Sequence, residues 1–148
     1  MCGIAGILNL RGPLSEQHRV DTIRRMTRTL SHRGPDGEGY HAEGPVVLGN
    51  RRLSIIDLEG GAQPMVGASG QVWITFNGEI YNYVELRLDM GRVDFQTKSD
   101  CEPPLHLYFR HGLGFARHLR GMFAIAIHDP EEDCLVLSRD PFGIKPLY

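Results

Sequence analysis

The chain has 148 residues, a length that favours one domain with a hydrophobic core of its own. Its 16 Lys and Arg against 18 Asp and Glu give a net charge of -2, so no basic excess is available to bind nucleic acid or an anionic membrane. No apolar run is long enough for a membrane span, and the N-terminus lacks the positive charge of a secretory signal. Three cysteines without zinc-type spacing fit a reduced, cytoplasmic compartment, and no metal site is expected.

Short apolar runs separated by Gly- and Pro-rich segments predict strands joined by tight turns. We expect a buried strand from Cys2 to Leu10, followed by a turn at residues 11–14. Apolar residues at helical spacing predict an amphipathic helix over residues 16–30, and Ser15 is suited to cap its N-terminus.

The rest of the chain continues this alternation of short strands with few helices. Strands are expected at residues 46–48, 53–56, 72–76, 122–128 and 134–138, and helices at 83–90 and 105–112. This pattern predicts an α+β fold with antiparallel sheets.

Cys2 becomes the first residue when the initiator methionine is removed, because cysteine is small. Its α-amino group, with a pKa of about 7.7–8.0, would then be neutral in a large fraction of molecules near pH 7.5. An amine beside a thiol can act as its general base without a histidine. A small buried cysteine without a chemical role is the alternative from this position alone.

Asn77 and Gly78 also have two interpretations. After a strand over residues 72–76, an Asn-Gly pair favours a two-residue hairpin turn. The same pair could instead supply one side-chain donor and one unhindered backbone donor to a tetrahedral oxyanion.

Seven short motifs, in a fixed order, distinguish these alternatives. They are CGIAG at 2–6, SHRGPD at 31–36, RLSIID at 52–57, NGEIYN at 77–82, SDCE at 99–102, RGMFA at 120–124 and RDPFGIKPLY at 139–148. Together they resemble the N-terminal glutaminase domain of class II glutamine amidotransferases, and the asparagine synthetase type in particular.

The resemblance implies an N-terminal-nucleophile fold, a four-layer αββα sandwich with two antiparallel sheets. It implies that the domain hydrolyses the side-chain amide of glutamine to glutamate and ammonia. Cys2 would be the nucleophile, and Asn77 with Gly78 would form the oxyanion hole. The remaining implied residues bind glutamine: Arg52 and the backbone of Leu53, Ser54, Ile55 and Ile56 at its carboxylate, and Glu79 and Asp100 at its ammonium group.

The side-chain chemistry agrees with these roles. Free glutamine is a zwitterion, so its site needs both a cation and an anion, and a guanidinium suits a carboxylate. His32 has no part in this mechanism and is expected to hold a loop near the site. Pro103 and Pro104 depart from the family pattern, and we expect them to delay the following helix and to make the aim of Asp100 less certain.

Nothing in the sequence resembles the ATP-binding loop of an asparagine synthetase. We therefore expect residues 2–148 to be an incomplete glutaminase domain, truncated at its C-terminal end, without a cofactor of its own. ATP and Mg²⁺ would belong to a missing ATP-pyrophosphatase domain or subunit, which would accept the ammonia. Self-association through an uncovered apolar face is a further expectation. Two alternatives stay open, namely an inactive or regulatory domain of the same fold, and a glutaminase domain that serves a different acceptor.

Overall fold

The computed structural model describes residues 1–10, 12, 14–67 and 70–148. The first half of these contains β1 (Gly3–Leu8), α1 (Glu16–Thr29), β2 (Gly37–Glu43), β3 (Val46–Arg52), β4 (Met65–Val66) and β5 (Trp73–Ile80). The second half contains α2 (Tyr83–Asp89), α3 (Glu102–His111), the 3₁₀ helix η1 (Gly112–His118), β6 (Gly121–Asp129) and β7 (Cys134–Arg139).

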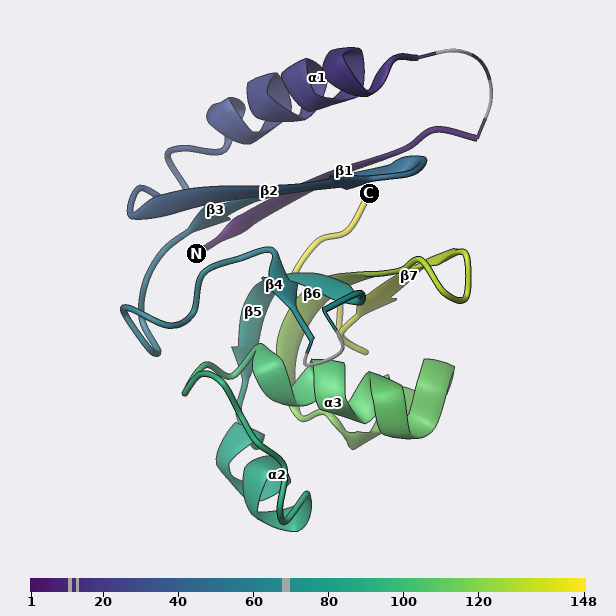
Figure 1. Ribbon diagram of the computed structural model, residues 1–148. Helices are drawn as coiled ribbons and strands as arrows, with labels where there is room; N and C mark the ends of the chain where they lie inside the picture. Colours follow the sequence, from purple (N-terminus) through teal and green to yellow (C-terminus); the bar gives the residue numbers. More distant parts are fainter. Residues whose placement is uncertain (11, 13, 68–69) are drawn as a thin grey trace.

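The strands form two antiparallel sheets that face each other. One sheet has the order β1-β3-β2 and the other has the order β4-β5-β6-β7. Helix α1 covers the outer face of the first sheet, and α3 covers the outer face of the second (Figure 1). The expected α+β architecture with four αββα layers is therefore confirmed.

Helix α1 lies directly on β3 because that strand has a glycine beneath it. Ser15 caps the helix as predicted, since its hydroxyl accepts a hydrogen bond from the His18 backbone at 3.2 Å. A Cβ at Gly49 would come within 3.0 Å of Ile23 and would collide with the Thr27 hydroxyl. The two buried residues of the helix therefore pack against backbone, and the close approach requires glycine.

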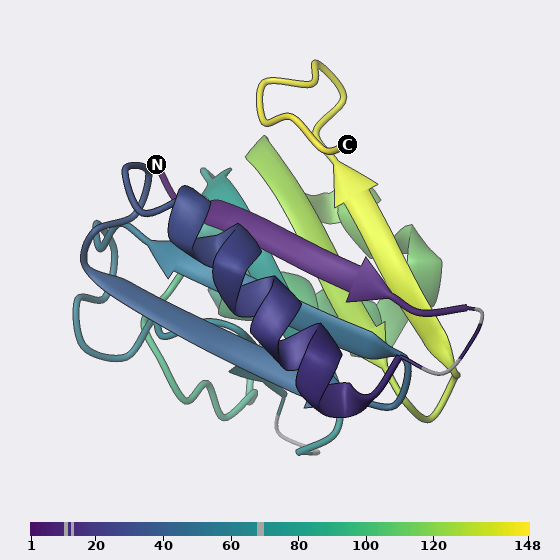
Figure 2. The ribbon, with the colours of Figure 1, turned by 90° about the horizontal axis from the view of Figure 1, so that it is seen from above.

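The larger core lies between the second sheet and α3. Strands β5 and β6 contribute Ile74, Phe76, Phe123 and Ile125, and α3 contributes Leu105. Each large side chain that is fully buried stabilises the fold by roughly 1.5–3 kcal/mol. The alternate residues of β5, which include Asn77, face the first sheet instead, because successive side chains of a strand point to opposite faces. Seen from above, α1 lies over the strands of the first sheet (Figure 2).

Several elements differ from the sequence-based expectations. Residues 53–56 form an irregular segment and not a strand, while β2 at 37–43 was not expected, because its glycines obscure the strand pattern. Helix α3 begins at Glu102, so the prediction that Pro103 and Pro104 delay it is wrong. Both prolines lie in the first turn, where backbone N–H groups have no partner within the helix to lose.

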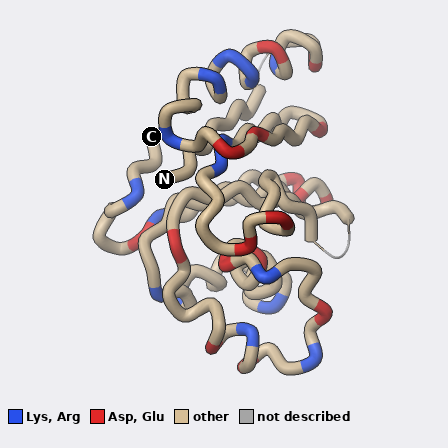
Figure 3. Tube along the Cα trace, turned by 90° about the vertical axis from the view of Figure 1, so that its left-hand side faces the viewer, with Lys and Arg blue, Asp and Glu red and all other residues tan. Residues whose placement is uncertain are grey.

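The turn expected at residues 11–14 lies partly outside the described residues. Acidic and basic residues are spread along the whole trace, and several arginines lie within α1 (Figure 3). Among the described residues, no helix is both long and apolar enough to cross a bilayer.

Candidate active site

A cleft at one end of the two sheets brings the predicted site residues together. Except for Ser54, all residues that the sequence analysis assigned to the site line this cleft. They are Cys2, Arg52, Leu53, Ile55, Ile56, Asn77, Gly78, Glu79 and Asp100. They come from the N-terminus, the end of β3, the segment after it, β5 and the loop before α3.

Cys2 immediately precedes β1 and is half-buried. The Leu53 backbone N–H donates a hydrogen bond to the Cys2 Sγ atom at 3.3 Å, and the Leu53 carbonyl lies 3.7 Å from the same sulfur. Arg33, from the SHRGPD motif, donates from Nε to the Cys2 carbonyl at 3.2 Å. The thiol is therefore held in a fixed position by its contacts with the Leu53 backbone.

Asn77 and Gly78 lie inside β5 and do not form a turn. Asn77 pairs with Ala124 and Gly78 pairs with Phe123, so the hairpin interpretation of this pair is wrong. A Cβ at Gly78 would collide with the Met122 carbonyl oxygen on the neighbouring strand, so this position requires glycine.

The Asn77 amide carries a polar atom that the fold does not satisfy. The residue is 5% exposed, and within the described part of the chain its Oδ1 atom is buried without a hydrogen-bond partner. Burying such a group costs roughly 1–3 kcal/mol. Oδ1 is an acceptor, so a donor on a ligand in the cleft would satisfy it, whereas the oxyanion role expected from the sequence belongs to the Nδ2 group of the same amide.

Arg52 provides the cationic group of the cleft. Its guanidinium donates to the Leu58 carbonyl at 3.0 Å, to the Ile56 carbonyl at 3.1 Å and to the Asp57 carbonyl. Two of these bonds come from Nη2. A guanidinium binds a carboxylate bidentately either through Nη1 and Nη2 or through Nε and Nη2, so both arrangements need Nη2. Arg52 therefore holds the segment after β3 in place, and a bidentate grip on a carboxylate requires the release of one carbonyl.

The segment after β3 is also fixed by Asp36 of the SHRGPD motif. The Ser54 backbone N–H donates to Asp36 Oδ2 at 2.8 Å, and the Asp36 N–H donates to the Arg52 carbonyl at 3.0 Å. The Ser54 amide is thus occupied by this contact, and Ser54 does not line the cleft. The structure therefore does not bring Ser54 together with the other predicted site residues, and its role in binding substrate stays a prediction.

Two carboxylates, Glu79 and Asp100, line the cleft with Arg52. Asp100 is 6% exposed and accepts a hydrogen bond from the Ile80 backbone N–H at 2.9 Å. Burial, together with the negative charge of Glu79, raises the pKa of Asp100 above its ordinary value. A bound ammonium group would offset both effects, because it supplies the opposite charge.

Asp100 is well positioned despite the double proline that follows it. Glu102 accepts hydrogen bonds from the backbone N–H of Gln96 at 2.7 Å and of Thr97 at 2.9 Å. The loop before α3 is therefore tied to the start of the helix. The concern that the prolines would misdirect Asp100 is not supported.

Lys145 is a cleft residue that the sequence analysis missed. It is 3% exposed, its Nζ atom hydrogen-bonds to Met1 Sδ, and it lines the cleft. Asp140 fixes its backbone by accepting from the Lys145 N–H at 2.9 Å. The signal was present in the RDPFGIKPLY motif, but a lysine there has no local pattern that predicts burial.

The other thiols and His32 lie outside the cleft. Cys101 is fully buried, and burial raises its pKa to about 12, which keeps it protonated and unreactive. His32 is exposed beyond the end of α1, where its Nδ1 atom lies 3.0 Å from the Thr29 carbonyl.

Comparison with known proteins agrees with this arrangement. A family model described as a glutamine amidotransferase domain matches residues 1–148. The chain belongs to this family. In this amidotransferase domain the residues that the sequence analysis expected to form the site, Ser54 excepted, line one cleft.

Curated relatives of this amidotransferase domain are named glutamine-hydrolysing asparagine synthetases. The chain is 46% identical to asparagine synthetase 2 of Bacillus subtilis and 41% identical to asparagine synthetase B of Escherichia coli. Each match covers 100% of this chain but only 20% and 26% of the relative's length, respectively.

A solved structure shows the same fold. The glutamine phosphoribosylpyrophosphate amidotransferase of B. subtilis, complexed with ADP and GMP, superposes with a TM-score of 0.77 at 20% sequence identity. The superposition covers 99% of this chain and 38% of that one. The fold of this amidotransferase domain is therefore that of a known amidotransferase.

Proposed function

We propose that this domain hydrolyses the side-chain amide of glutamine to glutamate and ammonia, with Cys2 as the nucleophile. The observation that carries the proposal is the cleft itself. It combines a positioned thiol, an unsatisfied buried amide, a guanidinium and two carboxylates. Opposite charges on separate elements fit the carboxylate and ammonium groups of a free amino acid.

The chemistry requires the amine of Cys2. Met1 occupies that position in the intact chain and lines the cleft, so its removal is part of the proposal. The neutral α-amine then takes the thiol proton as sulfur attacks the amide carbon. The resulting tetrahedral oxyanion would be stabilised by Asn77 and the Gly78 N–H, and each such donor is typically worth about 2.7–4 kcal/mol.

The intermediate then collapses. The ammonium proton is transferred to the leaving nitrogen, the C–N bond breaks, and ammonia leaves a thioester on Cys2. Water, deprotonated by the same amine, attacks the thioester carbon and releases glutamate and the free thiol. The second half-reaction restores the enzyme, and no histidine takes part.

The ammonia acceptor lies outside this chain in our proposal. The named relatives are asparagine synthetases, and the chain spans only 20–26% of the two described above. We infer that an ATP-pyrophosphatase domain or subunit, using ATP and Mg²⁺, passes the ammonia to activated aspartate. A reduced cytoplasm, which keeps the Cys2 thiol free, is the compartment we propose, and self-association is a further proposal.

The test separates the roles of the thiol and the amine. Cys2→Ala should abolish glutamate release from glutamine, and so should a chain whose N-terminus is blocked by an uncleaved extension. The matched control is Cys134→Ala, which lies outside the cleft and should leave activity unchanged. Full activity in the blocked chain, with mass spectrometry showing that the N-terminal extension is still present, would contradict the role of the Cys2 amine as general base.

A further inference from the structure

Two buried histidines meet between the sheets, at the end opposite the cleft. Arg52, at the cleft end of the first sheet, pairs with Gly37, whereas Glu43 pairs with Val46 at the other end. His41 lies two residues before Glu43 on β2, and His128 lies on β6, where it pairs with Trp73. The cluster of His41, Glu43 and His128 is thus remote from Cys2.

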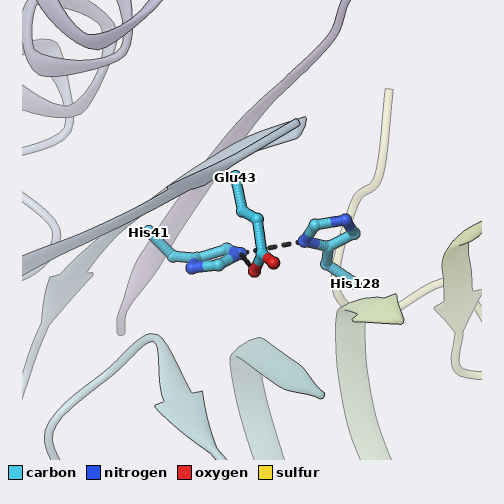
Figure 4. Close-up of side chains that lie close together, drawn as sticks. All are labelled: His41, Glu43 and His128. Atoms are coloured by element: carbon cyan, nitrogen blue, oxygen red, sulfur yellow. Dashed lines mark hydrogen bonds and ion pairs between the residues drawn. The ribbon is translucent and has the colours of Figure 1, made fainter. Parts of the chain in front are cut away.

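The three side chains converge on a small volume. His41 Nε2 lies 2.8 Å from His128 Nδ1 and 3.9 Å from Glu43 Oε2, and the three candidate ligand atoms all lie within 4.8 Å of one another. Figure 4 shows the two rings pointing at each other, with the Glu43 carboxylate beside the hydrogen bond that joins them. The His41 ring stacks on Trp73 at 4.3 Å between centroids, which fixes its orientation.

Both histidines have the charge state that metal binding needs. They are 7% and 4% exposed, and burial lowers the pKa of each, that of His41 to about 4 with a further contribution from His128. They are therefore neutral at pH 7. One of the two nitrogens that face each other, His41 Nε2 or His128 Nδ1, carries the proton of their hydrogen bond. If this proton moves to the other nitrogen of its own ring, both facing nitrogens have a free lone pair for a metal ion.

The spacing is close to that of a tetrahedral site. Ligand bonds of 2.0–2.1 Å at tetrahedral angles place ligand atoms about 3.3 Å apart. The two nitrogens need to separate by only about 0.5 Å from their present distance. The Glu43 side chain is 51% exposed and free to approach, and it opens the cluster to water on that side.

We propose that His41, His128 and Glu43 bind one divalent transition-metal ion of the Zn²⁺ type, with water as a fourth ligand, and that the ion clamps the two sheets together. Two imidazoles with one carboxylate select such an ion over Mg²⁺ or Ca²⁺, which prefer oxygen ligands. The site is structural and does not depend on glutamine hydrolysis.

The experiment is a calorimetric titration of Zn²⁺ into the Cys2→Ser chain, which lacks the half-buried cleft thiol. We expect one ion per chain. Glu43→Gln should raise the dissociation constant for Zn²⁺ about tenfold or more. The matched control is Glu132→Gln, which removes the same charge from the exposed β6–β7 turn and should change the constant less than about twofold. Mg²⁺ in place of Zn²⁺ should give no comparable heat.

A second readout identifies the ligands and does not require a buried histidine to be replaced. Co²⁺ bound at the site should show the visible bands of a tetrahedral ion without the charge-transfer band of a thiolate ligand. Absence of saturable Zn²⁺ binding in the millimolar range would overturn the proposal. Binding that Glu43→Gln leaves unchanged, or a thiolate band with Co²⁺, would also overturn it.

Discussion

Asn77 and Asn82 belong to one motif but should respond to mutation in opposite ways. The Asn82 amide is fully used by the fold, since it donates to the His118 carbonyl at 3.0 Å and accepts from the Arg120 N–H at 2.8 Å. The Asn77 Oδ1 atom is buried beside the cleft without a partner among the described residues. Replacing each with alanine therefore separates a catalytic amide from a structural one.

The two variants should differ in both kcat and stability. Asn77→Ala should lower kcat for glutamine hydrolysis about 10²–10³-fold, the cost of one oxyanion donor. Its stability should stay within about 1 kcal/mol of wild type, because loss of packing is offset by removal of an unsatisfied polar atom. Asn82→Ala leaves two backbone groups unpartnered and should cost at least about 2 kcal/mol, but should not change kcat in the folded protein.

Glutamate release under saturating glutamine gives kcat, and thermal unfolding of the same samples gives stability. A loss of 2 kcal/mol corresponds to a fall in Tm of about 4–8 °C for a chain of this size. If Asn77→Ala lowered Tm as much as Asn82→Ala while kcat fell less than about tenfold, Asn77 would be a structural residue and the oxyanion assignment would be refuted.

Three other variants test the remaining features. Arg52→Lys should raise KM for glutamine more than it lowers kcat, and should lower Tm, because lysine cannot hold three carbonyls in the guanidinium geometry; an unchanged KM would remove Arg52 from the substrate site. Lys145→Met removes a buried cation that lines the cleft, so kcat/KM for glutamine should fall because less positive charge is available to stabilise a developing oxyanion; an unchanged kcat/KM contradicts this. Although burial acts to raise it, backbone N–H donors from four residues hold the pKa of Asp140 below its ordinary value. The stabilising effect of the Asp140 carboxylate is therefore present above the unfolded pKa of about 3.9 and is lost as pH falls through the folded value. Asp140→Asn should be less stable than wild type by roughly 1–3 kcal/mol at pH 7, and its free energy of unfolding in urea should fall less toward pH 2. Parallel curves of stability against pH for the two proteins would contradict this.

Local patterns in the sequence predicted the elements whose conformation depends on near neighbours. Ser15 and the apolar spacing after it predicted α1, and the short apolar runs in β5 and β6 predicted two central strands. The ordered motifs predicted which residues meet at the cleft, although that prediction came from resemblance and not from geometry.

Only the tertiary structure decided the features that depend on distant partners. Residues 53–56 have the apolar content of a strand, yet Ile55 is 69% exposed, because Arg52 and Asp36 hold the backbone in another conformation. Lys145 is buried only because Asp140 turns the chain back toward the N-terminus. His41 and His128 are 87 residues apart and meet because two sheets stack, and no local periodicity encodes the packing of one sheet on another.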